Sequence, residues 1–435
     1  MILSSLSLLI SARFSPAFAQ SNLKSAWVVT NDLYGNKEHI SMTLSKSGET
    51  LRGELQGDDL EGTWKGNVVH FEAKDPSNNS SYTYDGTITA DLITGKVVLK
   101  NTGAMDGTHA FSAKLIIEPP SGPPRKVQFN QTDYHNQFSS DIKPALVIRP
   151  GDTIETKTID SGGIDEKGER KGLYGNPQSG PFFVYGARQG DTLAIHIKKL
   201  SLNRDYADSL DAMARRILDS RMAVKAKDLG KDIRWKIDTK RGVAYPEDKT
   251  GGLANFSVPL RPMLGCVAVA PAFGFAPFST GDCGRFGGNM DTNELVQGST
   301  VYLQIEQPGA LVYIGDAHAA QGDGETSEWG LETSMDVEFS VEILPKNFIS
   351  TPRIETSTHI VSVGMAGSLD EALKAATAGM TQWLEQDYEV SMSEIAQIYG
   401  SSLEYKVAQI VGRNVGMIAR INKERLKGLK LKKKG

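Results

Sequence analysis

The sequence predicts a mainly β protein with additional α-helices (α+β): a β-sandwich or barrel-like core with C-terminal helices, preceded by a small antiparallel β-barrel. Three observations support this fold class. Glycine is abundant, at 44 of 435 residues, as expected where many turns join short strands. Alternating and β-branched stretches recur between turn signals through the middle of the chain. After Val363 the pattern changes to helical spacing of the apolar residues.

Residues 1–19 have the pattern of a secretory signal peptide. An apolar run over residues 2–10 is followed by Ala-Phe-Ala just before Gln20, which is typical of a cleavage site, although no Lys or Arg precedes the run. No other segment approaches the roughly 20 apolar residues that a bilayer-spanning helix needs. We therefore expect an exported protein, periplasmic or secreted, without stable membrane insertion.

A first domain is expected over residues 23–118. The segment HISMTLSKSGETLRGELQGDDLEGTWKGNVVHFEAK places apolar residues at period two and interrupts them with Ser-Gly, Gly-Asp-Asp and Gly-Asn turns. This pattern predicts a small antiparallel barrel, lipocalin-like in shape. Residues 118–126, EPPSGPPRK, can hardly continue a helix or a strand because they contain four prolines, so we place a domain boundary there.

A second domain is expected over residues 125–423. Its first part is strand-rich, with one helix predicted over residues 205–226. Capping boxes that begin at Ser368 and Ser391 predict two helices near the C-terminus. The stretch YKVAQIVGRNVGMIARI fits a further helix or a strand. The last segment, residues 424–435, is a basic tail that we expect to be solvated.

Composition and motif content exclude several classes of function. The formal net charge of -4 argues against general nucleic-acid binding. The sequence lacks a G-x-S-x-G nucleophile elbow, a P-loop, a G-x-G-x-x-G after a strand, an H-E-x-x-H and a C-x-x-C. Cys266 and Cys283 are the only cysteines, and whether they pair is left open. We interpret Cys266 as a small core residue because no base lies beside it in the sequence.

The segment YIGDAHAAQGDGE, residues 313–325, concentrates potential metal ligands. The apolar run that leads into it indicates a buried strand, on which Asp316 and His318, at i and i+2, point to the same side. The glycines that follow can turn the chain so that Glu325 returns beside them. One His with two carboxylates suits a divalent ion that keeps a position open for water. Turn-capping carboxylates beside a hydrogen-bonded His are the equally favoured alternative.

Two further candidates lie elsewhere in the sequence. In GRFGGNMDTNEL, Gly287, Gly288 and Asn289 permit a close backbone approach, and Asp291 offers a ligand or a base. An ordinary Asx turn is the alternative for Asp291. His135 precedes a predicted strand, and a lone His is more often structural than functional.

In their order along the chain, these segments resemble the acetamidase/formamidase family. The resemblance covers about residues 127–423 and leaves out the first domain. It rests on IKPALVIRPGDTIETKTIDS, GNPQSGPFFVYGARQGDTLAIHI, RPMLGCVAVAPA, the block from Asn289 to Glu325, Glu332 in LETSMDVEFSVEIL, and the helical SLDEALKAATAGMTQWL and VSMSEIAQIYGSSLEYKVAQIV. The block from Asn289 to Glu325 is the most specific part. After Glu325 the family often has Val-Cys-Gly, whereas this chain has Thr-Ser-Glu and then Trp329, so the identity of the amide stays open.

The resemblance implies hydrolysis of a small linear amide, such as formamide or acetamide, to carboxylate and ammonia. It also implies a homo-oligomer and a divalent metal, with zinc as the expected ion. Carried over by motif, the metal ligands would be His135, Asp291, Asp316 and His318. Glu325 would be a further ligand or the general base that moves a proton to the departing nitrogen. Backbone N–H groups around Gly287 and Gly288, next to Asn289, would stabilise the oxyanion.

Two other interpretations of the sequence differ in function. In one, the chain is an exported ligand-binding or scaffold protein whose acidic loops hold a structural calcium ion and whose N-terminal barrel binds an apolar ligand. In the other, it is an amidohydrolase that acts on a larger or cyclic amide, as the added domain and the altered residues after Glu325 indicate.

Overall fold

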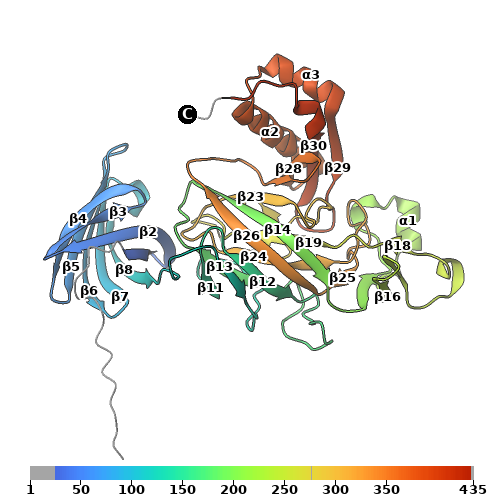
Figure 1. Ribbon diagram of the computed structural model, residues 1–435, viewed down its shortest axis with the longest axis horizontal. Helices are drawn as coiled ribbons and strands as arrows, with labels where there is room; N and C mark the ends of the chain where they lie inside the picture. The colour runs from blue at the N-terminus through green and yellow to red at the C-terminus, as the bar shows by residue number, and fades with distance from the viewer. Residues whose placement is uncertain (1–24, 276, 433–435) are drawn as a thin grey trace, which may run out of the picture. The chain divides into compact units, whose positions relative to one another are not determined.

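The computed structural model describes residues 25–275 and 277–432. The chain divides into two compact units, Met1–Ile116 and Ile117–Gly435. Both units consist mainly of strands, and the two longest helices lie near the C-terminus (Figure 1), which confirms the predicted fold class. The predicted signal peptide lies outside the described residues.

The first unit is a closed barrel of eight antiparallel strands. Each strand pairs with its neighbour in sequence, and β1 also pairs with β8, so both edges of every strand are satisfied. The strands are β1 (Ser25–Leu33), β2 (Asn36–Ser47), β3 (Thr50–Leu55), β4 (Asp58–Lys65), β5 (Val68–Asp75), β6 (Ser80–Thr89), β7 (Leu92–Lys100) and β8 (Gly107–Ile116). A 3-10 turn, η1 (Gly103–Met105), precedes β8.

The inward face of the barrel is filled by large side chains. The Phe71 and Tyr84 rings stack with centroids 4.7 Å apart, and Phe111 meets Tyr84 edge-on at 4.8 Å. The buried Tyr84 hydroxyl hydrogen-bonds with the Asn31 amide, which satisfies the polar end of the ring. The period-two pattern in the sequence therefore marks a packed barrel core.

The second unit is built on two large sheets (Figure 1). The first has eleven strands: β11 (Leu146–Ile148), β13 (Ser179–Val184), β15 (Tyr206–Leu210), β16 (Asp232–Asp238), β17 (Val243–Pro246), β18 (Val258–Pro259), β19 (Met263–Ala268), β21 (Cys283–Gly284), β22 (Gly287–Asn289), β24 (Val312–His318) and β25 (Glu332–Thr333). Its main path runs β18-β17-β16-β15-β25-β24-β19-β22-β21, and β13 joins it at β24. The positions of β24 and β19 are all buried, as expected for central strands that read as apolar runs.

The second sheet has nine strands in the order β29-β30-β28-β27-β23-β14-β26-β12-β9. Its strands are β9 (Lys126–Gln128), β12 (Thr153–Thr158), β14 (Thr192–Leu202), β23 (Thr300–Gln304), β26 (Met335–Leu344), β27 (Arg353–Glu355), β28 (His359–Ala366), β29 (Leu403–Val407) and β30 (Val415–Asn422). A separate short pair joins β10 (Gln137–Phe138) to β20 (Phe278–Ser279). The stretch for which the sequence left helix and strand open therefore contributes β29 and β30.

The two predicted C-terminal helices are present as α2 (Leu369–Asp387) and α3 (Met392–Ser402). Ser391 and Glu394 form a full capping box at the start of α3, and the Ser368 side chain accepts from the Glu371 amide at the start of α2. Helix α2 packs on β28 and β30 through Met380 and other buried residues. No helix in the described part of the chain combines the length and apolar character needed to cross a membrane.

The helix predicted over residues 205–226 is wrong. Residues Tyr206–Leu210 form β15, which pairs with both β16 and β25. The rest of the stretch contains only a 3-10 turn, η2 (Arg215–Ile217), and one short helix, α1 (Ser220–Lys225). The apolar residues that matched helical spacing, among them Met213 and Met222, are exposed, so no helical face is buried here and strand pairing prevails.

The basic tail contacts the rest of the second unit at a few points, although most of its described residues are exposed. It begins with a 3-10 turn, η4 (Lys423–Leu426), in which Leu426 is buried against the same cluster as α2. Further on, Lys430 pairs with Glu389, and the Lys432 amide donates to the Asp387 carbonyl at 2.9 Å. The tail is therefore attached near the end of α2, while most of its residues up to 432 remain exposed to solvent, as expected. One more 3-10 turn, η3 (Gly251–Leu253), lies between β17 and β18.

Candidate active site

Strand β24 carries Asp316 and His318 into the interior of the second unit. It pairs antiparallel with β19, where Met263 lies opposite His318, and with β25, where Glu332 lies opposite His318. Backbone pairing on both sides of β24 therefore fixes the backbone positions from which these side chains extend. The predicted buried strand is present and has the expected polar residues at its end.

Four carboxylates surround the His318 imidazole. Its Nε2 lies 3.1 Å from Glu332 Oε1 and 3.5 Å from Asp316 Oδ1. Ligand atoms of Asp291, His318 and Glu325 lie within 4.8 Å of one another, and so do those of Asp316, His318 and Glu332. All five side chains are buried. The structure thus brings together four of the residues singled out from the sequence and adds Glu332.

Three of the acidic residues have left-handed backbone conformations. The φ angle is 40° at Asp291, 57° at Asp316 and 50° at Glu325. A non-glycine residue in this region is strained and persists only where the surrounding structure holds it. Regular strand geometry is therefore interrupted at Asp316, although its carboxylate still lies beside His318.

Two glycines leave the space that the cluster occupies. A Cβ at Gly265 on β19 would stand 2.3 Å from Asp316 Oδ2 and 2.4 Å from Asp291 Oδ1. A Cβ at Gly330 would stand 2.7 Å from His318 Nδ1. All three distances are shorter than van der Waals contact allows, so a larger residue at either position would displace the carboxylates or the imidazole.

The Gln321 side chain orients the imidazole. Its Nε2 donates to the Asp291 carbonyl at 2.6 Å, so its Oε1 faces His318 Nδ1 at 2.8 Å. An amide oxygen only accepts hydrogen bonds, which places a proton on Nδ1 and turns Nε2 toward the carboxylates of Asp316 and Glu332. Metal-binding histidines are commonly held in this way, with the second ring nitrogen donating to a fixed acceptor.

Two asparagines hold Asp291 from the other side. Asn289 Nδ2 donates to Asp291 Oδ2 at 2.5 Å, and Asn176 Nδ2 donates to Asn289 Oδ1 at 2.9 Å. Asn289, which the sequence placed at the substrate, therefore lies at the edge of the cluster with a fixed orientation.

Comparison with known proteins connects this site to a family. The model of the Acetamidase/Formamidase family matches residues 279–405, a range that contains Asp291, His318 and Glu332. A protein of Schizosaccharomyces pombe assigned by name as a formamidase is 46% identical over 65 residues. That match covers 15% of this chain and 16% of the relative, so it spans well under two thirds of the relative's length.

Solved structures extend the similarity over most of the chain. A predicted acetamidase/formamidase from the thermophile Thermoanaerobacter tengcongensis is 25% identical with a TM-score of 0.61, and the match covers 70% of this chain and 98% of that one. This chain is thus similar to the acetamidase/formamidase family in sequence over residues 279–405 and in fold over 70% of its length. Acetamidases of Bacillus halodurans and Yersinia enterocolitica, each 24% identical, share the fold with TM-scores of 0.59 and 0.61. These matches cover 70% of this chain and 99% and 93% of the acetamidases, respectively.

The acidic cluster of this chain binds protons tightly. Burial raises the pKa of Glu325 to about 8, with His318 opposing the shift and Asp316 adding to it. Burial likewise raises the pKa of Glu332 to about 7, and burial together with Glu325 raises the pKa of Asp291. For His318, burial acts in the opposite direction, but the neighbouring Glu332 and Asp316 outweigh it and raise the pKa. Several groups of the site therefore change protonation near neutral pH.

A divalent ion fits the donor atoms of the cluster. Asp291 Oδ1, Asp316 Oδ1 and Glu332 Oε2 are buried without a hydrogen-bond partner among the described residues. A buried carboxylate oxygen without a partner is destabilising, and a cation would supply the missing interaction. One imidazole nitrogen with several carboxylate oxygens is a donor set that zinc accepts.

His135 and the two glycines of the predicted oxyanion site are not members of the two ligand groups found among the described residues. His135 is half-buried and forms a backbone bridge with Gln178, and it belongs to neither ligand group found among the described residues. Gly287 and Gly288, with φ of 82° and 98°, lie in β22 between β19 and β21. A Cβ at either would stand 2.3 Å from a carbonyl oxygen of a neighbouring segment, so sheet packing explains both glycines.

The two cysteines are free and buried. Burial raises the pKa of the Cys266 thiol, and the nearby Asp316 and Asp291 add to the shift. The thiol is therefore kept neutral, which agrees with the interpretation of Cys266 as a core residue.

Sequence reasoning assigned no role to Glu332. It lies fourteen residues after His318 and reaches the imidazole only because β25 pairs with β24. Its one signal in the sequence was an isolated glutamate within a segment that resembles the family. No spacing rule connects it to Asp316 and His318, because the pairing of these strands depends on the tertiary fold.

Proposed function

We propose that the chain hydrolyses the C–N bond of small linear amides, with formamide and acetamide as the first substrates to test. Water adds to the carbonyl carbon, the C–N bond breaks, and the products are a carboxylate and ammonia. The observation that carries the proposal is the buried group of four carboxylates around His318, in a segment that matches the Acetamidase/Formamidase family model. The names of its relatives supply the substrate class.

A divalent ion, zinc in the first instance, is part of the proposal. Asp316, His318 and Glu332 would hold it, with Asp291 adjacent. When bound, such an ion polarises a carbonyl group and lowers the pKa of bound water. The three buried carboxylate oxygens without partners support this assignment.

Glu325 is the residue that we assign to proton transfer. Its Oε1 accepts the Gly330 amide at 2.9 Å, which fixes the orientation of the carboxyl group. A pKa raised to about 8 means that the group carries a proton near neutral pH and can release it to the departing nitrogen. Amide nitrogen is a poor leaving group as an anion, so this proton is needed for the C–N bond to break.

Two neighbouring side chains orient members of the site. Gln321 fixes the imidazole of His318, and Asn289 fixes the Asp291 carboxylate. Because the cluster is buried, each of these polar interactions is stronger than it would be in water.

The test combines metal analysis with an ammonia assay on the purified protein. We expect bound metal, equal amounts of ammonia and carboxylate from formamide or acetamide, loss of activity with a chelator and recovery with zinc. Folded, metal-loaded protein that releases no ammonia from any amide would overturn the proposal. Bound calcium without amide hydrolysis would favour the scaffold interpretation instead.

A larger amide is the second candidate, because two aromatic residues lie beside the site. Trp329 precedes Gly330, whose amide binds Glu325, and its ring centroid lies 6.0 Å from that of Tyr174. Tyr174 is exposed and lies two residues before Asn176, which bonds Asn289. The two rings, tilted by 46° to one another, offer an apolar surface for an aryl or bulky acyl group.

Kinetics on two amides separates these candidates. If the pair binds the acyl group, Trp329→Ala lowers kcat/KM for phenylacetamide about tenfold, as expected for loss of an aromatic contact, and leaves acetamide nearly unchanged. Phe348→Ala serves as the control because Phe348 is also aromatic, is exposed and belongs to neither ligand group. An equal response to both amides would exclude a role of the aromatic pair in substrate choice.

A further inference from the structure

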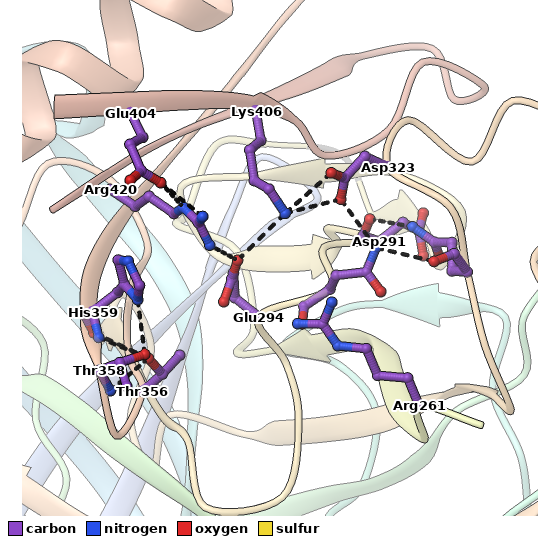
Figure 2. A network of polar contacts seen from close by, with 12 residues as sticks. Arg261, Asp291, Glu294, Asp323, Thr356, Thr358, His359, Glu404, Lys406 and Arg420 are labelled. Atoms are coloured by element: carbon purple, nitrogen blue, oxygen red, sulfur yellow. Dashed lines mark hydrogen bonds and ion pairs between the residues drawn. The ribbon is translucent and has the colours of Figure 1, made fainter. Parts of the chain in front are cut away.

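The C-terminal hairpin of β29 and β30 contacts two loops that carry members of the cluster. Figure 2 shows Lys406 reaching from the hairpin toward Asp323 and Glu294, with Arg420 beside it. Lys406 Nζ lies 3.0 Å from Asp323 Oδ2 and 3.9 Å from Glu294 Oε1. One ammonium group thus bridges two carboxylates that come from different loops.

Each of these carboxylates is close in sequence to a cluster residue. Glu294 follows Asp291 by three positions, and Asp323 precedes Glu325 by two. Both cluster residues have left-handed φ angles, 40° and 50°, which the surrounding structure must maintain. Holding Glu294 and Asp323 together therefore holds the two strained positions together.

The two loops are also joined directly. Asn293 Nδ2 donates to both Asp323 Oδ1 and the Gln321 carbonyl, each at 3.1 Å. Gln321 in turn binds the Asp291 carbonyl and His318 Nδ1. The contact of Lys406 with Asp323 is thus continuous with the hydrogen bonds that orient the imidazole.

The backbone of the hairpin segment adds a third connection. The Gly324 amide donates to the Ala408 carbonyl at 3.0 Å, and the Ile410 amide donates to the Gly324 carbonyl at 3.1 Å. These two hydrogen bonds attach Gly324, the residue just before Glu325, to the chain two to four positions after Lys406.

Arg420 balances the charge on the hairpin side. Its Nη1 lies 3.0 Å from Glu294 Oε1, and its Nη2 lies 2.7 Å from Glu404 Oε2. Glu294 is buried. When Lys406 is removed, Glu294 keeps Arg420 as its cationic partner, but the bridge from Glu294 to Asp323 is lost. Removing Lys406 therefore breaks this ionic bridge between the loops without leaving a buried charge unpaired.

We propose that Lys406 is a positioning residue for the active site: it holds the loop of Asp291 and the loop of Glu325 at the separation that the cluster requires. Only the expected effect on kinetics rests on the proposed function. The consequences for loop mobility and for metal affinity follow from the geometry alone.

The experiment compares Lys406→Met with Lys406→Arg and with a matched control, Lys374→Met. Lys374 pairs with Glu371 on the exposed face of α2, so the control also removes a lysine from an ion pair. Hydrogen exchange is measured over residues 321–325, zinc affinity is measured with the metal alone, and kcat and KM are measured for formamide.

We expect Lys406→Met to speed exchange at residues 321–325, to weaken zinc binding about tenfold and to lower kcat about tenfold with a smaller change in KM. Lys406→Arg restores most of each property, and Lys374→Met matches the wild type in all of them. Asp323→Asn, which removes the other side of the bridge at a half-exposed position, should reproduce Lys406→Met.

Wild-type exchange and zinc affinity in both Lys406→Met and Asp323→Asn would overturn the proposal. A changed exchange rate and zinc affinity in a protein whose wild type hydrolyses no amide would support the positioning role and overturn the proposed function. The melting temperature, measured for all four variants, identifies any variant that is globally destabilised. If Lys406→Met is destabilised in this way, the milder Asp323→Asn decides whether the positioning role holds.

Discussion

Glu332 Oε1 lies 3.1 Å from His318 Nε2, across the antiparallel pairing of β25 with β24. The contact joins two fully buried, ionisable side chains, one of which was recognised from the sequence and one of which was not. The other carboxylate oxygen of Glu332, Oε2, has no hydrogen-bond partner among the described residues. Glu332 therefore has one oxygen on the imidazole and one available to a cation.

The first prediction concerns the charge of Glu332. Glu332→Gln keeps the size of the side chain but removes the anionic oxygens, so zinc affinity should fall by about 10- to 100-fold, as for other carboxylate–histidine pairs at metal sites. Competition with a chelator measures the affinity. Glu338→Gln, which removes a half-exposed partner of Lys126 on β26, is the control. Unchanged zinc affinity in Glu332→Gln would remove Glu332 from the metal site.

A second prediction separates metal binding from proton transfer. His318→Ala should lose metal and activity together while the fold survives, because the imidazole is shared by both ligand groups. Glu325→Gln should retain the metal and lose turnover, because the amide cannot deliver the proton. Metal analysis and ammonia release, measured on the same samples, distinguish the two variants. Full activity in both would show that the site lies elsewhere.

The third prediction is a fall in stability of the metal-free protein as pH rises. The folded-state pKa values of Glu325 and Glu332 are raised to about 8 and about 7, above the values near 4.5 of an unfolded chain. Groups with raised pKa values stabilise the fold fully below the unfolded pKa and lose that contribution as pH rises through the folded pKa. The melting temperature in the presence of a chelator should therefore fall between about pH 5 and about pH 8.

Zinc should reverse this fall, because a cation replaces the protons that the carboxylates lose. Glu325→Gln should flatten the dependence on pH, since it removes one of the two titrating groups. A melting temperature that rises across this interval in the metal-free wild type would contradict the assignment of raised pKa values.

The sequence predicted those parts of the site that depend on local spacing. Asp316 and His318 were recognised because they follow a buried apolar run at i and i+2, and Glu325 because glycines can turn the chain back. Glu332 could not be found this way, since its place beside His318 depends on the pairing of β25 with β24. His135 was included on the family motif, and it lies outside both ligand groups.

The same distinction applies to the fold. The capping box at Ser391 correctly predicted α3, because capping is a local interaction between Ser391 and Glu394. The helix predicted over residues 205–226 failed because Tyr206–Leu210 pairs with β16 and β25, which the local pattern does not record. Local propensity is weak enough for such pairing to override it.

A fourth prediction concerns acid stability at Asp152, far from the cluster in sequence. Burial alone would raise the pKa of this carboxyl group, but hydrogen bonds from the Arg125 side chain and from the Arg125 and Arg149 amides outweigh burial and lower it. A lowered pKa contributes stability above the unfolded value near 4, and that contribution is lost as pH falls through the folded value.

Asp152→Asn should therefore lower the free energy of unfolding by about 1–3 kcal/mol at neutral pH, because it weakens buried hydrogen bonds to a charged partner. The difference from wild type should shrink in acid. Urea denaturation at neutral and acidic pH measures both values, with Asp228→Asn as an exposed control in the same unit. A difference that is independent of pH would show that the charge of Asp152 is not what stabilises this turn.

The last prediction tests the space between the two aspartates. Gly265→Ala introduces a Cβ that would stand 2.3 Å from Asp316 Oδ2 and 2.4 Å from Asp291 Oδ1, so the carboxylates must move apart. Gly265 lies on a central buried strand, where the backbone has little freedom to shift and overpacking costs about 1–3 kcal/mol. We expect a lower melting temperature, weaker zinc binding and loss of amide hydrolysis.

Gly322→Ala is the matched control, because it lies in the loop before Glu325 and a Cβ there meets no atom within 4 Å. This variant should keep wild-type zinc affinity, although it lies closer in sequence to Glu325 than Gly265 does. If Gly265→Ala binds zinc as tightly as the wild type, the two carboxylates do not share an ion across Gly265. The ligand set would then be restricted to the group on the Glu332 side of His318.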